Sequence, residues 1–117
     1  MTYMLIILEP HGQRDARSNE EGRAAYARMV QCSSELAARG VLRASQSLLA
    51  DRAGTRVQVR DGKRTLVDGP FSESKEMIGG YFIVDCATRD EAVQIASELP
   101  AAEWATVEVR EFGPCFA

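Results

Sequence analysis

Two capped helices, each placed between apolar strands, constrain the fold of this chain more than any other feature. Ser18 is followed three residues later by Glu21, and Thr88 by Glu91, which is the capping-box pattern of a helix start. Apolar residues at spacings of three and four follow each box. Four segments are apolar enough to form the strands on either side: Thr2–Leu8, Val41–Leu48, Gly80–Cys86 and Ala105–Phe112. The order strand–helix–strand therefore occurs twice.

A hairpin signal separates the two halves. Asp61-Gly62 lies between the alternating segments Val57–Val59 and Thr65–Val67, and Asp-Gly favours the two-residue turns that join antiparallel strands. Without the hairpin, the order of elements is the split βαβ plan of ferredoxin-like folds. We therefore predict one α+β domain over residues 1–117, with an antiparallel sheet, two helices on one face and an inserted β-hairpin.

The sheet face opposite the helices has no further helix to cover it. Thr2–Leu8 is apolar at nearly every position, which is typical of a strand covered on both faces. A second copy of the chain is the simplest cover. We predict a homodimer in which two sheets pack face to face as a dimeric α+β barrel.

The composition is that of an ordinary globular domain. Of the 117 residues, 45% are apolar and 26% charged, and the net charge of -3 offers no basic stripe to nucleic acid. No segment approaches the ~20 apolar residues of a membrane helix, so we expect a cytoplasmic protein. Cys32, Cys86 and Cys115 have neither disulfide-framework nor metal-site spacing. The residues call for no metal and no cofactor.

The segment 68–82 holds most of the polar groups that could form a site. Asp68 begins the turn Asp-Gly-Pro-Phe, and a short helical turn is expected from Ser72 to Glu76. Asp68 is a candidate general base or acceptor for a ligand, and Phe71 a candidate pocket wall. The alternative is structural, because Asp, Gly and Pro favour turns and Phe can anchor a loop. Gly79-Gly80 indicates close backbone approach or a bulge.

Five further residues are candidates for ligand binding. Glu73 and Lys75 would meet an acidic ligand, or else form an exposed charged turn. Tyr81 would offer its hydroxyl to a ligand, or else be a half-buried strand aromatic. Glu108 and Arg110 share one face of the last strand. They would line a dimer cavity, or form an ion pair of little energetic value.

His11 is the only histidine and follows the first strand. Its side chain is the one whose ordinary pKa lies near neutrality. We expect either an exposed loop residue or an acid/base couple in which His11 is paired with Asp68 or Glu73.

The Asp-Gly-Pro-Phe turn at 68–71, followed by Lys75-Glu76 and Gly79-Gly80-Tyr81, resembles the DGPF branch of the YCII-related family. The likeness extends over essentially the whole chain, up to Val107–Arg110. It implies a dimeric α+β barrel, a family without a settled activity and, by analogy, a link to sigma-factor signalling. A site proposed for YCII-type proteins uses a His in the first helix and an Asp at the end of the second. Neither is present here, and Leu99 precedes Pro100.

Three functional hypotheses remain open from the sequence. The first is a binder of a small polar or acidic metabolite near the Asp-Gly-Pro-Phe loop. The second is an enzyme in which Asp68, with His11 or Tyr81, moves protons on a small carbonyl or lactone-like substrate. The third is an interaction module that contacts a sigma-factor partner through the hairpin Arg56–Val67.

Overall fold

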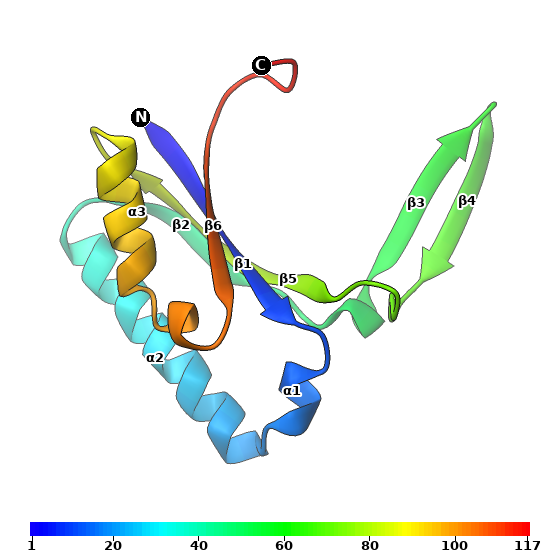
Figure 1. Cartoon of the computed structure of the whole chain (residues 1–117), viewed down its shortest axis with the longest axis horizontal. Coiled ribbons are helices and arrows are strands. Elements are labelled where there is room, and N and C mark those ends of the chain that lie inside the picture. Colours follow the sequence, from blue (N-terminus) through cyan, green and yellow to red (C-terminus); the bar gives the residue numbers. More distant parts are fainter.

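The computed structural model describes residues 1–117 and shows an α+β fold with an extended hairpin (Figure 1). The helices and strands are β1 (Thr2–Pro10), α1 (Gln13–Ala16), α2 (Asn19–Ala38), β2 (Leu42–Ser47), β3 (Thr55–Arg60), β4 (Lys63–Asp68), β5 (Glu76–Asp85), α3 (Arg89–Glu98) and β6 (Thr106–Glu111). Two single-turn 3-10 helices lie at Asp51–Ala53 and Pro100–Glu103. No helix is long and apolar enough to cross a membrane.

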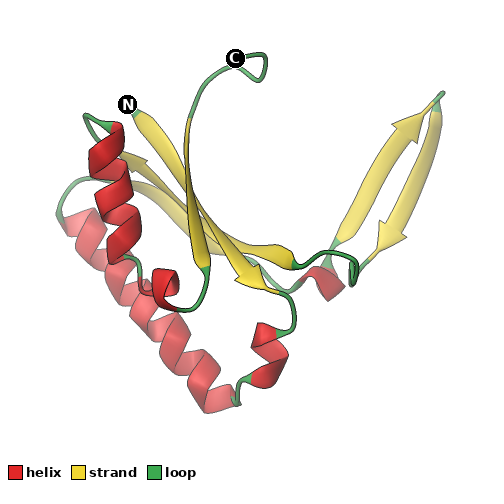
Figure 2. Cartoon of the chain, in the orientation of Figure 1, coloured by secondary structure: helices red, strands yellow, loops and turns green.

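The main sheet has four antiparallel strands in the order β2–β5–β1–β6. Figure 2 shows the two long helices together on one side of it. The predicted antiparallel sheet, the helices on one face and the inserted hairpin are thus confirmed. The pairing of two copies into a barrel stays a prediction.

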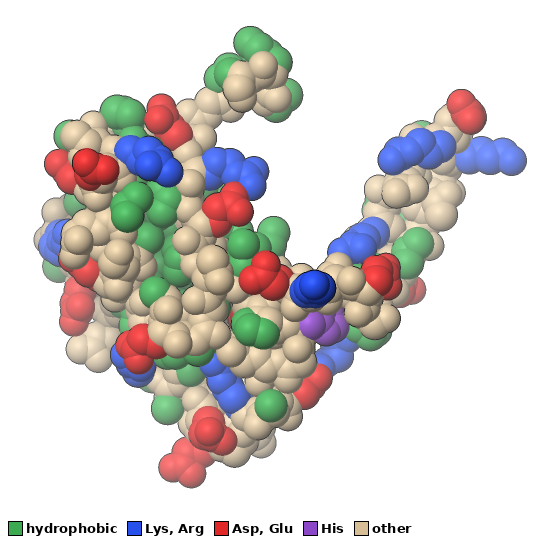
Figure 3. All heavy atoms as spheres, in the orientation of Figure 1, with side chains coloured by type: hydrophobic (Ala, Val, Ile, Leu, Met, Phe, Trp, Pro, Cys, Tyr) green, Lys and Arg blue, Asp and Glu red, His purple; other side chains and the backbone are tan.

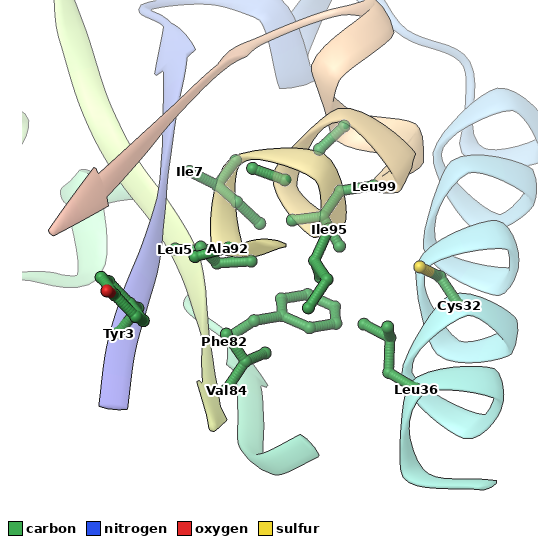
Figure 4. Packing of buried hydrophobic residues seen from close by; sticks show 12 residues of the cluster. Tyr3, Leu5, Ile7, Cys32, Leu36, Phe82, Val84, Ala92, Ile95 and Leu99 are labelled. Atoms are coloured by element: carbon green, nitrogen blue, oxygen red, sulfur yellow. The ribbon is translucent and has the colours of Figure 1, made fainter. Parts of the chain in front are cut away.

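The core lies between this sheet and the helices (Figure 4). Alternate residues of β1 face inward, among them Tyr3 and Leu5, and they meet Val84 from β5. Leu36 of α2 and Ile95 of α3 close the cluster from the helical side. Burial of each such side chain contributes roughly 1.5–3 kcal/mol, so packing, more than helix propensity, holds the two layers together.

Both predicted helix starts are found, with one difference in detail. Ser18 and Glu21 form the full reciprocal box at the start of α2. At α3, the Thr88 hydroxyl accepts from the backbone N–H of Glu91 at 3.2 Å, but the Glu91 carboxylate accepts from the N–H of Ala87. Helix α3 therefore has the bond from its first turn to the Thr88 hydroxyl, but lacks the reciprocal bond from the Thr88 backbone N–H to Glu91.

The sequence prediction was wrong about the segment Ser72–Glu76. It forms a tight turn, in which Ser74 N–H donates to the carbonyl of Phe71 at 3.0 Å, and β5 already begins at Glu76. The glycine pair therefore lies inside β5, where the register with β1 shifts between Ile7 and Leu8. This shift confirms the predicted bulge, because Gly79 is the residue left without a partner.

Strands β3 and β4 form a separate two-stranded hairpin, which we call the arm (Thr55–Asp68). Figure 1 shows it projecting away from the sheet and helices. Every residue of both strands is exposed. The sequence predicted the hairpin but not its separation from the sheet, because strand patterns do not report which strands pair.

The sheet face opposite the helices, which we call the open face, carries apolar side chains. Met4, Ile6 and Leu8 are its half-buried residues on β1, and Tyr81 and Ile83 are those on β5. No element of the same copy covers them. This is the surface that the predicted dimer would bury.

Candidate functional site

A cavity of about 820 Å³ lies between α2 and the part of the sheet formed by β1, β2 and β5. Its apolar wall comes from both layers and from the 3-10 turn before β6. The main apolar side chains on this wall are Ile7, Phe82, Met29, Val30 and Trp104. Serine and glutamine side chains of α2 and β2 also line it. The cavity is therefore amphipathic.

Glu9 places a buried carboxylate in the lining of this cavity. It follows Tyr3, Leu5 and Ile7 on the inward face of β1 and is only 5% exposed. Its Oε1 lies 2.5 Å from Nε of Arg14. The two atoms are not aligned as a hydrogen bond, so Oε1 accepts none. The contact is held chiefly by the opposite charges of the two groups.

Arg14 joins three segments of the chain through one guanidinium group. Besides the contact with Glu9, Nη1 donates to the carbonyl of Leu48 at 2.7 Å and Nη2 to that of Gly79 at 3.2 Å. Arg14 comes from α1, a single helical turn. The loop after β1, the end of β2 and the bulge of β5 are thus fixed around the cavity.

Two glycines make room for this arrangement. A Cβ atom at Gly79 would overlap Oε2 of Glu9, and one at Gly80 would lie 2.7 Å from the carbonyl oxygen of Gln46. The structure thus confirms the close backbone approach expected of this pair. Only glycine at position 79 lets the carboxylate sit against the strand.

The lining of the cavity carries more positive than negative side chains. Arg14, Arg17 and Arg23 are part of it, against Glu9 as the one acidic residue. The guanidinium of Arg17 lies over the ring of Trp104, 5.3 Å from its centroid, which holds it beside the apolar wall. The amino end of α2 is also part of the lining and adds partial positive charge.

None of the eight residues singled out from the sequence lines this cavity. His11 does not contact Asp68 or Glu73; its Nε2 lies 2.6 Å from Oδ2 of Asp51. The same Asp51 oxygen accepts from the backbone N–H of Phe71 at 3.1 Å. Sequence reasoning missed Asp51, because nothing in the pattern around it marks a residue that joins three loops.

The Asp-Gly-Pro-Phe turn forms the root of the arm. Asp68 accepts a hydrogen bond from the hydroxyl of Thr55 at 2.8 Å. Phe71 is buried, and the guanidinium of Arg56 lies 3.7 Å from its ring centroid. Glu73 and Lys75 are exposed on the turn that follows. The bond between Thr55 and Asp68 closes the base of the arm, and the contact between Arg56 and Phe71 joins the arm to the segment that follows it.

The other three candidates gather on the open face. By register, Ile6 of β1 lies opposite Tyr81 on one side and Glu108 on the other. Arg110 donates through Nε to the carboxylate of Glu108 at 2.9 Å. These side chains are grouped, but away from the cavity, and they would line the interior of a face-to-face dimer.

The Asp51 contact predicts a specific response to acid. The hydrogen bond from His11, together with the N–H of Phe71, lowers the pKa of Asp51 below its usual value. A group with a lowered pKa stabilises the folded state above its unfolded pKa, about 3.9, and this contribution disappears as the pH falls through the folded value. In urea titrations at pH 6, wild type should have a higher free energy of unfolding than Asp51→Asn. This difference, the stability gap, should narrow below about pH 4. A gap that is constant from pH 6 to pH 3 would refute the assignment.

The comparisons with known proteins agree with the fold and with the resemblance to the YCII-related family. The model of the YCII-related domain matches residues 1–114. The chain belongs to the YCII-related family. An uncharacterised protein of Rhizobium meliloti (strain 1021) is 27% identical over 106 residues, covering 91% of this YCII-related chain and 86% of its own.

A solved structure shares the fold of this YCII-related protein. It is the 5-chloro-2-hydroxyhydroquinone dehydrochlorinase TftG of Burkholderia phenoliruptrix AC1100, in complex with 2,5-dihydroxybenzoquinone. The TM-score is 0.59 and the sequence identity 16%, with 97% of this chain and 94% of the other covered. At this identity the match shows a likeness of fold alone.

Proposed function

We propose that this YCII-related protein binds a small, partly apolar acid in the cavity between α2 and the sheet. The observation that carries the proposal is the Glu9–Arg14 pair in a cavity whose lining also carries Arg17 and Arg23. This places the site away from the Asp-Gly-Pro-Phe loop, where the sequence analysis expected it. The general expectation of an acidic metabolite is retained.

The size and the chemistry of the cavity define the ligand class. A volume of about 820 Å³ falls in the range typical of small-molecule sites. The wall of Phe82, Met29 and Trp104 suits a flat apolar ring. Arginines bind carboxylates in two-pronged fashion. A small ring acid meets these conditions. TftG, of the same fold, was solved with a hydroxylated ring compound.

We also propose that the protein is a homodimer of the DGPF branch. The apolar open face supports the dimer, because Met4, Ile6 and Ile83 have no cover within one copy. The Asp-Gly-Pro-Phe turn at the root of the arm supports the branch. The cavity lies on the opposite side of the sheet, so ligand binding in it does not require the second copy.

Thermal-shift measurements with 2-hydroxybenzoate, benzoate and 2,5-dihydroxybenzoate test the binding proposal, with the neutral benzamide as the matched compound. A ligand at 100 times its dissociation constant stabilises the folded state by about 2.7 kcal/mol. We expect at least one carboxylate to raise the melting temperature, and benzamide not to do so. The effect should be lost in Arg17→Gln/Arg23→Gln.

Two control variants locate the effect. Arg64→Gln on the arm removes the same charge far from the cavity and should respond as wild type, as should Asp68→Ala. No shift with any carboxylate would contradict the proposal. A shift that survives in Arg17→Gln/Arg23→Gln but disappears in Asp68→Ala would instead return the site to the Asp-Gly-Pro-Phe loop.

A further inference from the structure

The arm exposes apolar side chains that a lone copy of the chain does not cover. Val57 and Val59 are 59% and 58% exposed, and Leu66 is 51% exposed. An isolated two-stranded hairpin is at best marginally stable in water. The arm therefore calls for a partner surface.

Three of the four exposed apolar residues of the arm lie on one face. Val57 pairs with Leu66, and Val59 with Arg64, whereas the adjacent pair on the other face is Gln58 with Thr65. Residues directly opposite each other in an antiparallel pair point to the same side. One face of the arm is therefore mainly apolar, and the other is polar apart from Val67.

The root of the arm holds it in a fixed direction. The N–H of Gly69 donates to the carbonyl of Gly54 at 2.9 Å, closing the base of the hairpin. Asp51 connects this base to the loop after β1 through His11 and to Phe71. These contacts make the arm a positioned element of the fold.

Charge is divided between the arm and the rest of the chain. The arm contains four basic residues and two acidic ones: Arg56, Arg60, Lys63, Arg64, Asp61 and Asp68. The whole chain has 14 basic and 17 acidic residues, which leaves 10 basic and 15 acidic outside the arm. A basic arm and an acidic body are complementary between two copies of the same chain.

The arm and the open face border the same gap. Figure 3 shows an empty space between the sheet and the arm, and Figure 1 shows the helices on the far side of the sheet. The open face and the arm therefore flank one space. A second copy, placed there by a two-fold axis, would cover both surfaces, and its own two would be covered in return.

We propose that the arm clasps a second copy of this chain, which sits in the gap between the open face and the arm. The apolar face of the arm, with Val57, Val59 and Leu66, packs on the flank of the partner copy, and Arg64 on the same face meets the acidic body. This inference rests on the homodimer proposed above. It adds that the arm is part of the dimer contact, and it assigns the arm to this chain's own second copy in preference to a different protein.

Sedimentation equilibrium of four proteins tests the clasp. Val57→Lys/Leu66→Lys places two charges on the apolar face, and Gln58→Lys/Thr65→Lys places the same two charges on the polar face. Ile83→Asp charges the open face. We expect the dimer dissociation constant to rise at least about tenfold for the first double variant and to stay within about twofold for the second, while Ile83→Asp should give monomers.

The outcomes separate the clasp from the dimer itself. If Ile83→Asp is monomeric but Val57→Lys/Leu66→Lys associates as tightly as wild type, the dimer stands and the clasp is refuted. If wild type is monomeric at micromolar concentration, both are refuted. Hydrogen exchange in the unmodified protein gives a second test without variants. Amides of Val57–Val59 should exchange more slowly in the dimer than after dilution to monomer, and equal rates would overturn the clasp.

Discussion

Replacement of Arg14 by methionine is expected to lower the free energy of unfolding by about 3 kcal/mol. Removal of one partner from a buried ion pair typically costs about 3–5 kcal/mol, because the remaining charge is left unpaired. The lower end applies here, since Glu9 is 7% exposed through its side chain but Arg14 is 30% exposed. The variant also loses the hydrogen bonds from Arg14 to Leu48 and Gly79. Urea unfolding followed by circular dichroism measures the loss.

Two further variants show whether the cost comes from the unpaired charge. The double variant Glu9→Gln/Arg14→Met removes both charges and should recover a substantial part of the loss, since no ion is left buried. Arg39→Met breaks an exposed pair with Glu98 on the helical side of the sheet and should cost less than about 1 kcal/mol. Equal losses in Arg14→Met and Arg39→Met would mean that the pair in the cavity is solvated, and the account of the cavity would fail.

Replacement of Gly79 by alanine is expected to destabilise the protein by about 1–3 kcal/mol, the usual cost of an added group in a filled space. Its Cβ would overlap the carboxylate of Glu9 and come within 3.1 Å of Nη2 of Arg14. One methyl group should therefore displace both members of the pair. Ligand binding in the cavity should weaken as well. The same urea titration, repeated with the ligand found in the thermal-shift panel, measures both effects.

Gly22 provides the matched control for this substitution. A Cβ at Gly22 would meet nothing within 4 Å, and the residue is the fourth of α2. Gly22→Ala should therefore stabilise the protein by about 0.5–1 kcal/mol, since alanine is the better helix former. If Gly79→Ala proves as harmless as Gly22→Ala, Glu9 does not occupy the position described.

The fold was predictable from the sequence where local signals and side-chain periodicity agree. Ser18 with Glu21 located the start of α2, and Asp61-Gly62 located the tip of the arm. Both signals depend on bonds between residues close in the chain. The antiparallel sheet with helices on one face followed from the repeated strand–helix–strand pattern. The turn Ser72–Glu76 was mistaken for a helix, because its charged residues suit a helix start as well as a loop before a strand.

The candidate site was much less predictable. The glycine pair was recognised as a close backbone approach, but Glu9 and Arg14 were not singled out. Glu9 continues the alternation of β1 and could have been read as an inward carboxylate. Arg14 lies in a four-residue helix, too short for any periodicity to show. Its contacts to Leu48 and Gly79 join segments 34 and 65 residues away, which only the folded chain reveals.

The conspicuous Asp-Gly-Pro-Phe motif illustrates the opposite error. Asp68 and Phe71 drew attention as site residues because polar turns often carry function. Here Asp68 bonds Thr55, and Phe71 lies beneath Arg56. These contacts hold the base of the arm in place. The motif and the cavity are connected through β5, yet no residue of the motif lines the cavity.

The most direct test of the binding proposal is a two-dimensional NMR titration with 2-hydroxybenzoate, in which backbone amide shifts locate the ligand. The account predicts the largest changes at Ser45–Leu48, at Gly79 and Gly80, and along the first turns of α2. These residues surround the cavity. Changes confined to Asp68–Glu76 or to the open face, or no changes at millimolar ligand, would contradict the claim that this cavity is the binding site.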